Sequence, residues 1–327
     1  IQQDGHVRNT TLNTDVGGDD KTNYGFTVLW EPNDDFDLKV HHEIMEDNSE
    51  QGAYTNRNVV GELACTITQI GFDPANGCEK DANDGPDTTE SDGSNFSNND
   101  YETTIVTANF NTEAFLYTYI YSLRDMDEQN MQDFDGAPAH LLRMNFFNDW
   151  EQTSHEFRVT SQFSDTVQFI AGFYDWEADF EQRWDVYDLF YQLSRLGVPP
   201  WGAGRQGVEG YSDVFPWEDD VAGNNGQSQV TTSTAVFFSA DWFVADNWTL
   251  TAGFRWTEEE KDFVGGASAP GYYPLRGEPW PGIFNPYEAK AKWTETTPKL
   301  GLRYQPSDDA MFYASYSEGF KSGGFFA

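Results

Sequence analysis

The stretch 24–40 reads YGFTVLWEPNDDFDLKV and contains two segments in which apolar and polar residues alternate. Successive side chains of a strand point to opposite faces, so Tyr24, Phe26, Val28 and Trp30 share one face of the first segment. A short acidic turn, PNDD, follows, and the alternation then resumes. Two alternating segments joined by so short a turn indicate an antiparallel β-hairpin.

The same alternation recurs along the chain, and the connections between the alternating segments are of two unequal kinds. The short ones are polar turns at residues 31–36, 109–114, 162–167, 243–248 and 305–310. The long ones are polar excursions near residues 46–100, 126–150, 181–228 and 263–292. An outer-membrane β-barrel needs this asymmetry, because its periplasmic side only reverses the chain while its outer side meets the ligand.

The pattern contains about ten strands, with a partial one at residues 2–9. A soluble sandwich would bury the apolar face of these strands in a dry core, whereas a membrane barrel turns it to lipid and the polar face to a wet lumen. Alternation alone does not separate the two. The strand length favours the barrel, since about 9–11 residues cross a bilayer. The predicted fold class is all-β, an antiparallel transmembrane β-barrel with short periplasmic turns and long extracellular loops.

The charge of the chain is strongly negative. Acidic residues outnumber basic ones by 55 to 19, a formal net charge of −36, which repels nucleic acid and excludes it as an expected partner. The acids of segment 46–100 either solvate the surface or bind divalent cations where loops face lipopolysaccharide. Residues 81–87 (DANDGPD) loosely resemble a calcium loop but lack its ligand spacing and terminal glutamate. Loop-bound Ca²⁺ is the one cofactor considered, and no metal site is assigned.

Aromatic residues are abundant, at 16% of the chain. Aromatic girdles at the two interfaces of a membrane would use many of them. The sequence has no run of about 18 apolar residues, so no transmembrane helix is expected. Barrel strands give no such run, because they alternate.

Residues that could carry chemistry are few. Cys65 and Cys78 are expected to form a local disulfide in an oxidising compartment; a pair of metal-binding thiolates is the alternative, but a second ligand pair is missing. The segment 202–207 (GAGRQG) matches a dinucleotide-binding pattern without the βαβ unit around it, so it is interpreted as a glycine-rich loop. The sequence contains neither a nucleophile elbow nor a zinc-protease motif, and no enzyme activity is predicted.

Two sets of residues are candidates for ligand binding. Aromatic residues of loop 181–228 could stack on a sugar, a catecholate or a flat chelate, or could simply pack the loop into a lid. Basic residues on the presumed lumen face could guide an anionic ligand, pair with carboxylates inside the lumen, or balance its charge. The candidates are Trp184, Tyr187, Tyr191, Trp201, Tyr211 and Trp217 in the loop, and Arg158, Arg255 and Arg303 in the lumen.

Several stretches resemble the barrel of TonB-dependent outer-membrane receptors, in the order in which that family shows them. They are 29–36 (LWEPNDDF), 155–165 (HEFRVTSQFSD), 169–174 (FIAGFY), 251–261 (TAGFRWTEEEK), 297–304 (TPKLGLRY) and 312–325 (FYASYSEGFKSGGF). The resemblance implies a barrel of 22 strands closed by a plug domain. With about eleven strands, residues 1–327 are expected to be a segment of such a barrel, without the plug domain and the C-terminal strands.

The resemblance also implies a function and a place in the cell. The expected function is uptake of a scarce nutrient across the outer membrane of a Gram-negative bacterium. A ferric siderophore is the default ligand, and an oligosaccharide or cobalamin fits equally well. The expected partners are the TonB–ExbB–ExbD energy-coupling complex, the nutrient, and outer-membrane lipid with lipopolysaccharide. The alternative is a structural or adhesive outer-surface assembly subunit built from a receptor-like barrel.

Overall fold

The structure is a computed structural model that describes residues 1–55, 87–91, 93, 95–136, 142–187, 221–268 and 287–325. The described residues form strands and turns, without an α-helix, and so contain no helix that could span a membrane. The strands are β1 (Gln2–Gln3), β2 (Val7–Asn9), β3 (Thr14–Val16), β4 (Asp19–Asn33), β5 (Phe36–Asp47), β6 (Thr88–Thr89), β7 (Phe96–Asn111), β8 (Phe115–Asp133), β9 (Arg143–Ser161), β10 (Val167–Tyr187), β11 (Val221–Ala245), β12 (Trp248–Ser268), β13 (Tyr287–Ser307) and β14 (Ala310–Ser317).

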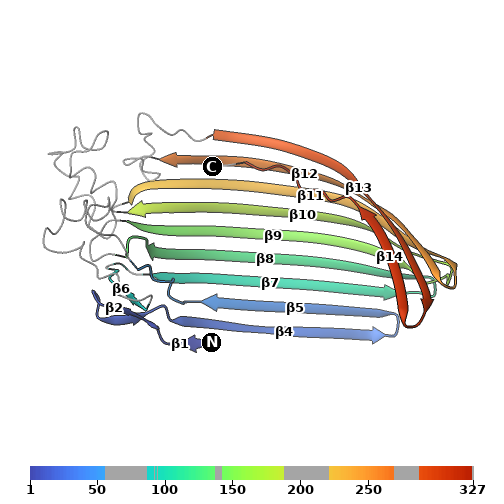
Figure 1. Cartoon of the computed structure of the whole chain (residues 1–327), viewed down its shortest axis with the longest axis horizontal. Coiled ribbons are helices and arrows are strands. Elements are labelled where there is room, and N and C mark those ends of the chain that lie inside the picture. The colour runs from blue at the N-terminus through green and yellow to red at the C-terminus, as the bar shows by residue number, and fades with distance from the viewer. Residues whose placement is uncertain are drawn as a thin grey trace.

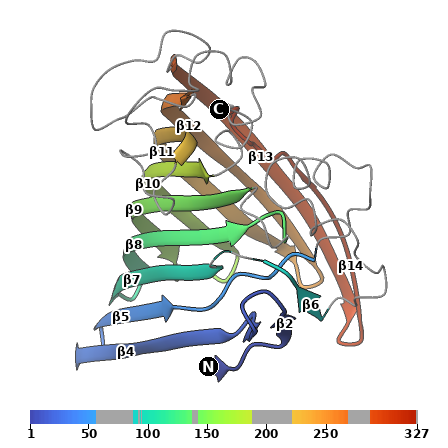
Figure 2. The same cartoon turned by 90° about the vertical axis from the view of Figure 1, so that its left-hand side faces the viewer.

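One antiparallel sheet of 11 strands makes up most of the molecule, in the order β1-β4-β5-β7-β8-β9-β10-β11-β12-β13-β14. Its ten long strands follow each other in chain order, so the sheet is a series of hairpins (Figure 1). A small sheet of 3 strands, β3-β2-β6, lies beside the start of β4. The large sheet curves into a trough (Figure 2). The structure confirms the antiparallel all-β wall that the alternation predicts.

The connections of the sheet are as unequal as the sequence predicts. At one end, which we call the short-turn rim, the strands are joined by residues 34–35, 112–114, 162–166, 246–247 and 308–309. The strand ends joined by 48–95, 134–142, 188–220 and 269–286 gather at the opposite end, the long-loop rim (Figure 1).

Two of the long connections are shorter in the structure than the sequence predicts. The predicted loop 126–150 is mostly strand, because β8 continues to Asp133 and β9 begins at Arg143. The loop 181–228 is likewise shortened by β10 and β11. Both faces of the wall carry polar residues near the long-loop rim, so alternation of hydrophobicity stops there while the hydrogen-bonded ladder goes on.

The two faces of the sheet differ in character. The outer face carries Tyr24, Phe26, Val28 and Trp30, which are 53 to 56% exposed. The inner face lies on the concave side of the trough and is largely polar. Among the described residues, the buried hydrophobic ones are only Val16, Ala178, Ala235 and Phe263. A soluble sandwich needs a dry core against its apolar face, so this exposed apolar face supports the membrane barrel over the sandwich.

Aromatic rings form a row on the outer face along the short-turn rim. The rings of Trp248 and Tyr304 stack with their centroids 4.3 Å apart, and Tyr304 lies 6.5 Å from Phe312. Phe110 and Tyr117 continue the row on β7 and β8, with centroids 6.3 Å apart. Such a row is typical of a barrel at the interface between hydrocarbon and water, where amphipathic rings are stable.

Candidate functional site

The inner face near the short-turn rim carries the basic residues predicted to line a lumen. Arg158 of β9 and Arg255 of β12 lie in one row across the sheet, because Arg158 faces Gly172, Gly172 faces Phe237, and Phe237 faces Arg255. The Phe237 ring occupies the space over Gly172, since a Cβ on that glycine would lie 2.3 Å from the ring. We call these four residues the arginine row.

The two guanidinium groups of the arginine row are held differently. Arg158 Nε lies 2.8 Å from Glu156 Oε1, an ion pair without a well-aligned hydrogen bond. Arg255 Nε donates to Thr257 Oγ1 at 3.2 Å, and its guanidinium carbon lies 5.8 Å from the centre of the Phe237 ring. Arg303 lies outside the row and closer to the short-turn rim, where it donates to Thr249 Oγ1 at 3.0 Å.

Among the described residues, the aromatic candidate Trp184 lies far from the basic candidates. Trp184 of β10 lies on the inner face near the long-loop rim, in edge contact with Phe146 at 6.1 Å between ring centroids. At about 3.3 Å per residue, Trp184 is about 40 Å along β10 from Gly172 in the arginine row. A small ligand therefore cannot contact Trp184 and the arginine row at once. Tyr187 ends β10 with its backbone described, and the remaining candidates lie outside the described residues: Tyr191, Trp201, Tyr211, Trp217, Cys65 and Cys78.

A polar network that sequence reasoning missed crosses the inner face near the long-loop rim. Gln227 Nε2 donates to Gln182 Oε1 at 2.8 Å, and Gln182 Nε2 donates to Asn148 Oδ1 at 2.8 Å. Asn148 Nδ2 donates to Glu128 Oε2 at 3.0 Å, and Tyr101 Oη donates to Glu128 Oε1. Five neighbouring strands, β7 to β11, thus contribute one residue each. We call these five residues the amide ladder.

Aromatic side chains flank the amide ladder on both sides along the strands. Trp150 and Phe180 lie on the side of the short-turn rim, with ring centroids 5.6 Å apart. Phe146 and Trp184 lie on the other side, and Phe134 extends this second group at 6.1 Å from Phe146. Each flank is two residues from the ladder along its strand, which is about 7 Å. The inner wall therefore presents a polar strip between two aromatic flanks.

The outer face near the long-loop rim is acidic. Carboxylates face each other across successive strands from β5 to β10, at Glu46, Asp100, Asp127, Asp149 and Glu181. Asp127 lies beyond the apolar part of β8, and burial together with the neighbouring Asp149 and Asp100 carboxylates raises its pKa. Within the described ranges, no group of three or more acidic, histidine or cysteine side chains is arranged to hold a metal ion. Residues 81–87, which resemble a calcium loop only loosely, lie outside these ranges except for Asp87.

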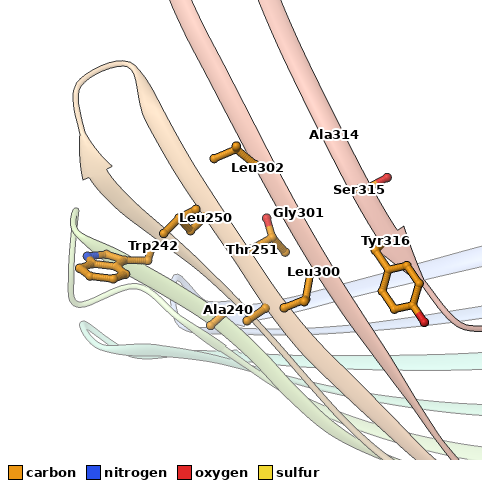
Figure 3. A pocket seen from close by; sticks show the side chains of 11 residues that line it. Ala240, Trp242, Leu250, Thr251, Leu300, Gly301, Leu302, Ala314, Ser315 and Tyr316 are labelled. Carbon is orange, nitrogen blue, oxygen red and sulfur yellow. The ribbon is translucent and has the colours of Figure 1, made fainter.

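An open apolar groove of about 630 Å³ lies on the outer face of β11 to β14 (Figure 3). Small side chains form its floor at Ala240, Ala252 and Ala314, and larger ones flank it, among them Leu300 and Tyr316. The groove lies in the apolar part of the wall, next to the aromatic row of the short-turn rim. Its chemistry suits hydrocarbon and not a polar ligand.

A curved antiparallel wall with a lipid-compatible outer face, a polar inner face and one short-turn rim defines the class of outer-membrane β-barrels. A family model described as TonB dependent receptor-like, beta-barrel, matches residues 46–327. The chain belongs to this family, as its sequence motifs indicate. None of the curated proteins compared with the chain matches it.

Solved structures share this fold at low sequence identity. The ferric yersiniabactin uptake receptor FyuA from Yersinia pestis matches with a TM-score of 0.66 and 12% identity over 95% of this chain and 39% of its own. The siderophore receptor PiuA from Acinetobacter baumannii matches with a TM-score of 0.58 and 11% identity over 92% and 42%. The open form of the ferric-catecholate import receptor Fiu from E. coli K12 matches with a TM-score of 0.58 and 8% identity over 97% of this chain and 48% of its own.

The chain spans less than half the length of these three receptors. Family membership nevertheless places it in the outer membrane of a Gram-negative bacterium, as predicted. The family is one of transporters and not of enzymes, which agrees with the prediction from the sequence.

Proposed function

We propose that the chain is a wall segment of a TonB-dependent transporter that takes up a scarce nutrient, such as a ferric siderophore, across the outer membrane. The observation that carries the proposal is the two-faced wall, with apolar side chains outward, the amide ladder and arginine row inward, and the long connections at one rim. This arrangement offers a ligand a polar surface inside a barrel whose exterior suits lipid. The names of FyuA, PiuA and Fiu make ferric siderophores the first ligands to test.

The proposal assigns a role to each level of the inner wall. The amide ladder and its aromatic flanks contact the arriving nutrient, because they lie next to the long connections. The arginine row lies within the apolar part of the wall, where a plug domain with carboxylates on its surface would contact it. Energy for release comes from the TonB–ExbB–ExbD complex acting through that plug, and outer-membrane lipid with lipopolysaccharide surrounds the outer face. The whole barrel has 22 strands in this proposal.

The proposal is tested by uptake in cells of the source bacterium. A strain that lacks the gene is compared with a strain that lacks TonB, using radiolabelled ferric siderophores and radiolabelled neutral oligosaccharides as nutrients. We expect both deletions to abolish uptake of the same nutrient, and a plasmid copy of the gene to restore it in the first strain only. Uptake of every nutrient at wild-type rates in the strain without the gene contradicts the transport function.

A further inference from the structure

The chemistry of the amide ladder narrows the class of nutrient. From β7 to β12, the described inner-face residues beyond Arg124 and Lys261 toward the long-loop rim include no lysine or arginine. Lys261 itself is engaged, since its Nζ lies 3.3 Å from Glu259 Oε1 and 5.7 Å from the centre of the Trp293 ring. The one charged member of the ladder is Glu128. Arg124 lies on the inner face four residues along β8 from Glu128, and its charge acts on the Tyr101 hydroxyl. The ladder from Glu128 to Gln227 itself offers a multiply negative ligand a carboxylate and no cation.

The overall charge of the chain acts in the same direction. A formal net charge of −36 repels anions approaching from solution and lowers their local concentration at the wall. A ferric tris-catecholate carries three negative charges, so both the long-range field and the local surface disfavour it. A neutral ligand feels neither effect.

The hydrogen-bonding capacity of the ladder suits hydroxyl groups. Each primary amide has two N–H donors and an oxygen with two lone pairs. Gln182 uses one donor toward Asn148 and one lone pair toward Gln227, and so retains one of each. A hydroxyl group donates and accepts at once, so it satisfies both. An anion only accepts and would leave the amide oxygens without a partner.

The shape of the surface suits an elongated ligand. Neighbouring strands lie about 4.8 Å apart, so the ladder from Glu128 to Gln227 crosses three such spacings, about 14 Å. The flanks of Trp150 with Phe180, and of Phe146 with Trp184, leave the strip open at its ends. Aromatic rings beside a few placed polar groups are typical of small-molecule sites, and ring faces pack well on the C–H faces of sugars.

We infer that the amide ladder and its aromatic flanks bind a neutral, hydroxyl-rich oligosaccharide, which runs across the strands from β8 to β11. This inference rests on the proposed transport function and names its substrate class. It assigns the hydrogen bonding of the ligand to Asn148, Gln182 and Gln227, and the stacking to Trp150 and Trp184.

The inference is tested by calorimetric titration of the protein, purified from the outer membrane in the length that the cell makes. The probes are cellohexaose, maltohexaose and xylohexaose, with a ferric tris-catecholate and a neutral ferric trihydroxamate as comparators. We expect at least one hexasaccharide to bind with an affinity that salt does not change, since no ion pair forms. We expect Gln182→Ala and Trp150→Ala each to weaken that binding about tenfold, the loss that one hydrogen bond or one aromatic contact produces.

A matched control is available on the same strand and face. Gln168 of β10 is also an inner-face glutamine, but it lies about 46 Å along the strand from Gln182. Gln168→Ala is expected to leave the affinity unchanged, which separates loss of the site from loss of the fold. Circular dichroism of all three variants checks that the strands are retained.

Other outcomes overturn the inference. Binding of a ferric chelate without binding of any hexasaccharide refutes the substrate class. The proposed transport function still stands in that case if uptake of the ferric chelate needs TonB. Hexasaccharide binding that Gln182→Ala and Trp150→Ala do not weaken refutes the site. If no probe of either kind binds, the substrate class fails, and the transport function fails with it only if the strain without the gene takes up every nutrient at wild-type rates.

Discussion

One face of the wall meets lipid and the other meets the lumen, so the cost of introducing a charge depends on which face carries it. On the lipid face of β13, this cost can be measured at different depths in the membrane. Leu300 is 56% exposed on the outer face and faces Ala252. It lies four residues from Tyr304, in the aromatic row, and four from Thr296 at the other end of the apolar part. Four residues are about 13 Å along a strand. Leu300 is therefore close to the middle of the hydrocarbon layer.

A lysine in place of Leu300 would put an ammonium group at this depth. The cost at the midplane of a barrel is about 2–4 kcal/mol, and it falls to about 0–1 kcal/mol near the interfaces. Since 1.4 kcal/mol is a factor of ten, Leu300→Lys is expected to shift the folding equilibrium by about 30- to 700-fold. Thr296→Lys, on the same face at the interface, is expected to cost about 0–1 kcal/mol.

The control places the same charge at the same depth on the opposite face. Thr251 faces Gly301 on the inner face, and its hydroxyl contacts Asp241 at 2.6 Å. Thr251→Lys puts the ammonium group in the lumen beside a carboxylate, so we expect a change of about 1 kcal/mol or less.

Denaturant titration in phospholipid vesicles, followed by tryptophan fluorescence, measures all three variants and the wild type. Equal costs for Leu300→Lys and Thr251→Lys would refute the assignment of the two faces. A cost that does not vary between Leu300→Lys and Thr296→Lys would refute the assignment of depth.

Two further predictions concern the arginine row and the acidic outer face. Gly172→Ala is expected to destabilise the wall by about 1–3 kcal/mol, because its Cβ would lie 2.3 Å from the Phe237 ring and 2.8 Å from the Phe157 backbone oxygen. Phe237→Leu in the same chain removes only the first overlap, so it should recover part of the loss in denaturant titration, and no recovery would contradict the ring overlap as a cause. Because its pKa is raised, Asp127 keeps its proton to a higher pH in the folded state than in the unfolded state. The protonated carboxyl therefore contributes stability below the ordinary aspartate pKa of about 3.9. That stability is lost as pH rises through the raised pKa of the folded state. Asp127→Asn should remove this loss of stability with rising pH, so the variant should be more stable than wild type at neutral pH. Identical pH profiles of the unfolding free energy for the variant and wild type would show that repulsion within the carboxylate row does not destabilise the wall.

The sequence predicted those features of the wall that depend only on the order of residues within one strand. Alternation with a period of two placed the strands and assigned Arg158 and Arg255 to the face opposite the apolar residues, because the face of a residue follows from its position along its own strand. The extent of the strands was missed where both faces become polar, as at 126–150. There the ladder of backbone hydrogen bonds maintains the strand, and backbone bonding leaves no trace in a hydrophobicity pattern.

The amide ladder could not be found in the sequence, because it is a property of register. Its members lie on five strands at irregular separations along the chain, and they meet only because Glu128 faces Asn148 and Asn148 faces Gln182. A shift of one residue in either pairing would turn one partner to the other face. The aromatic residue Trp184 was predicted from composition, but its distance from Arg158 and Arg255 depends on the full length of β10.

The chain-order pairing of the long strands makes the hairpin the unit in which such a wall can change. Insertion of one hairpin separates only the strand pair at the point of insertion, and removal of one requires only its two flanking strands to pair anew. All remaining pairs stay intact, and the circumference changes by two strands. Because barrel diameter grows with strand number, duplication of a hairpin would widen the pore without redesign of the existing wall. A lineage can therefore vary pore size and rim chemistry separately, the first by whole hairpins and the second by the long connections.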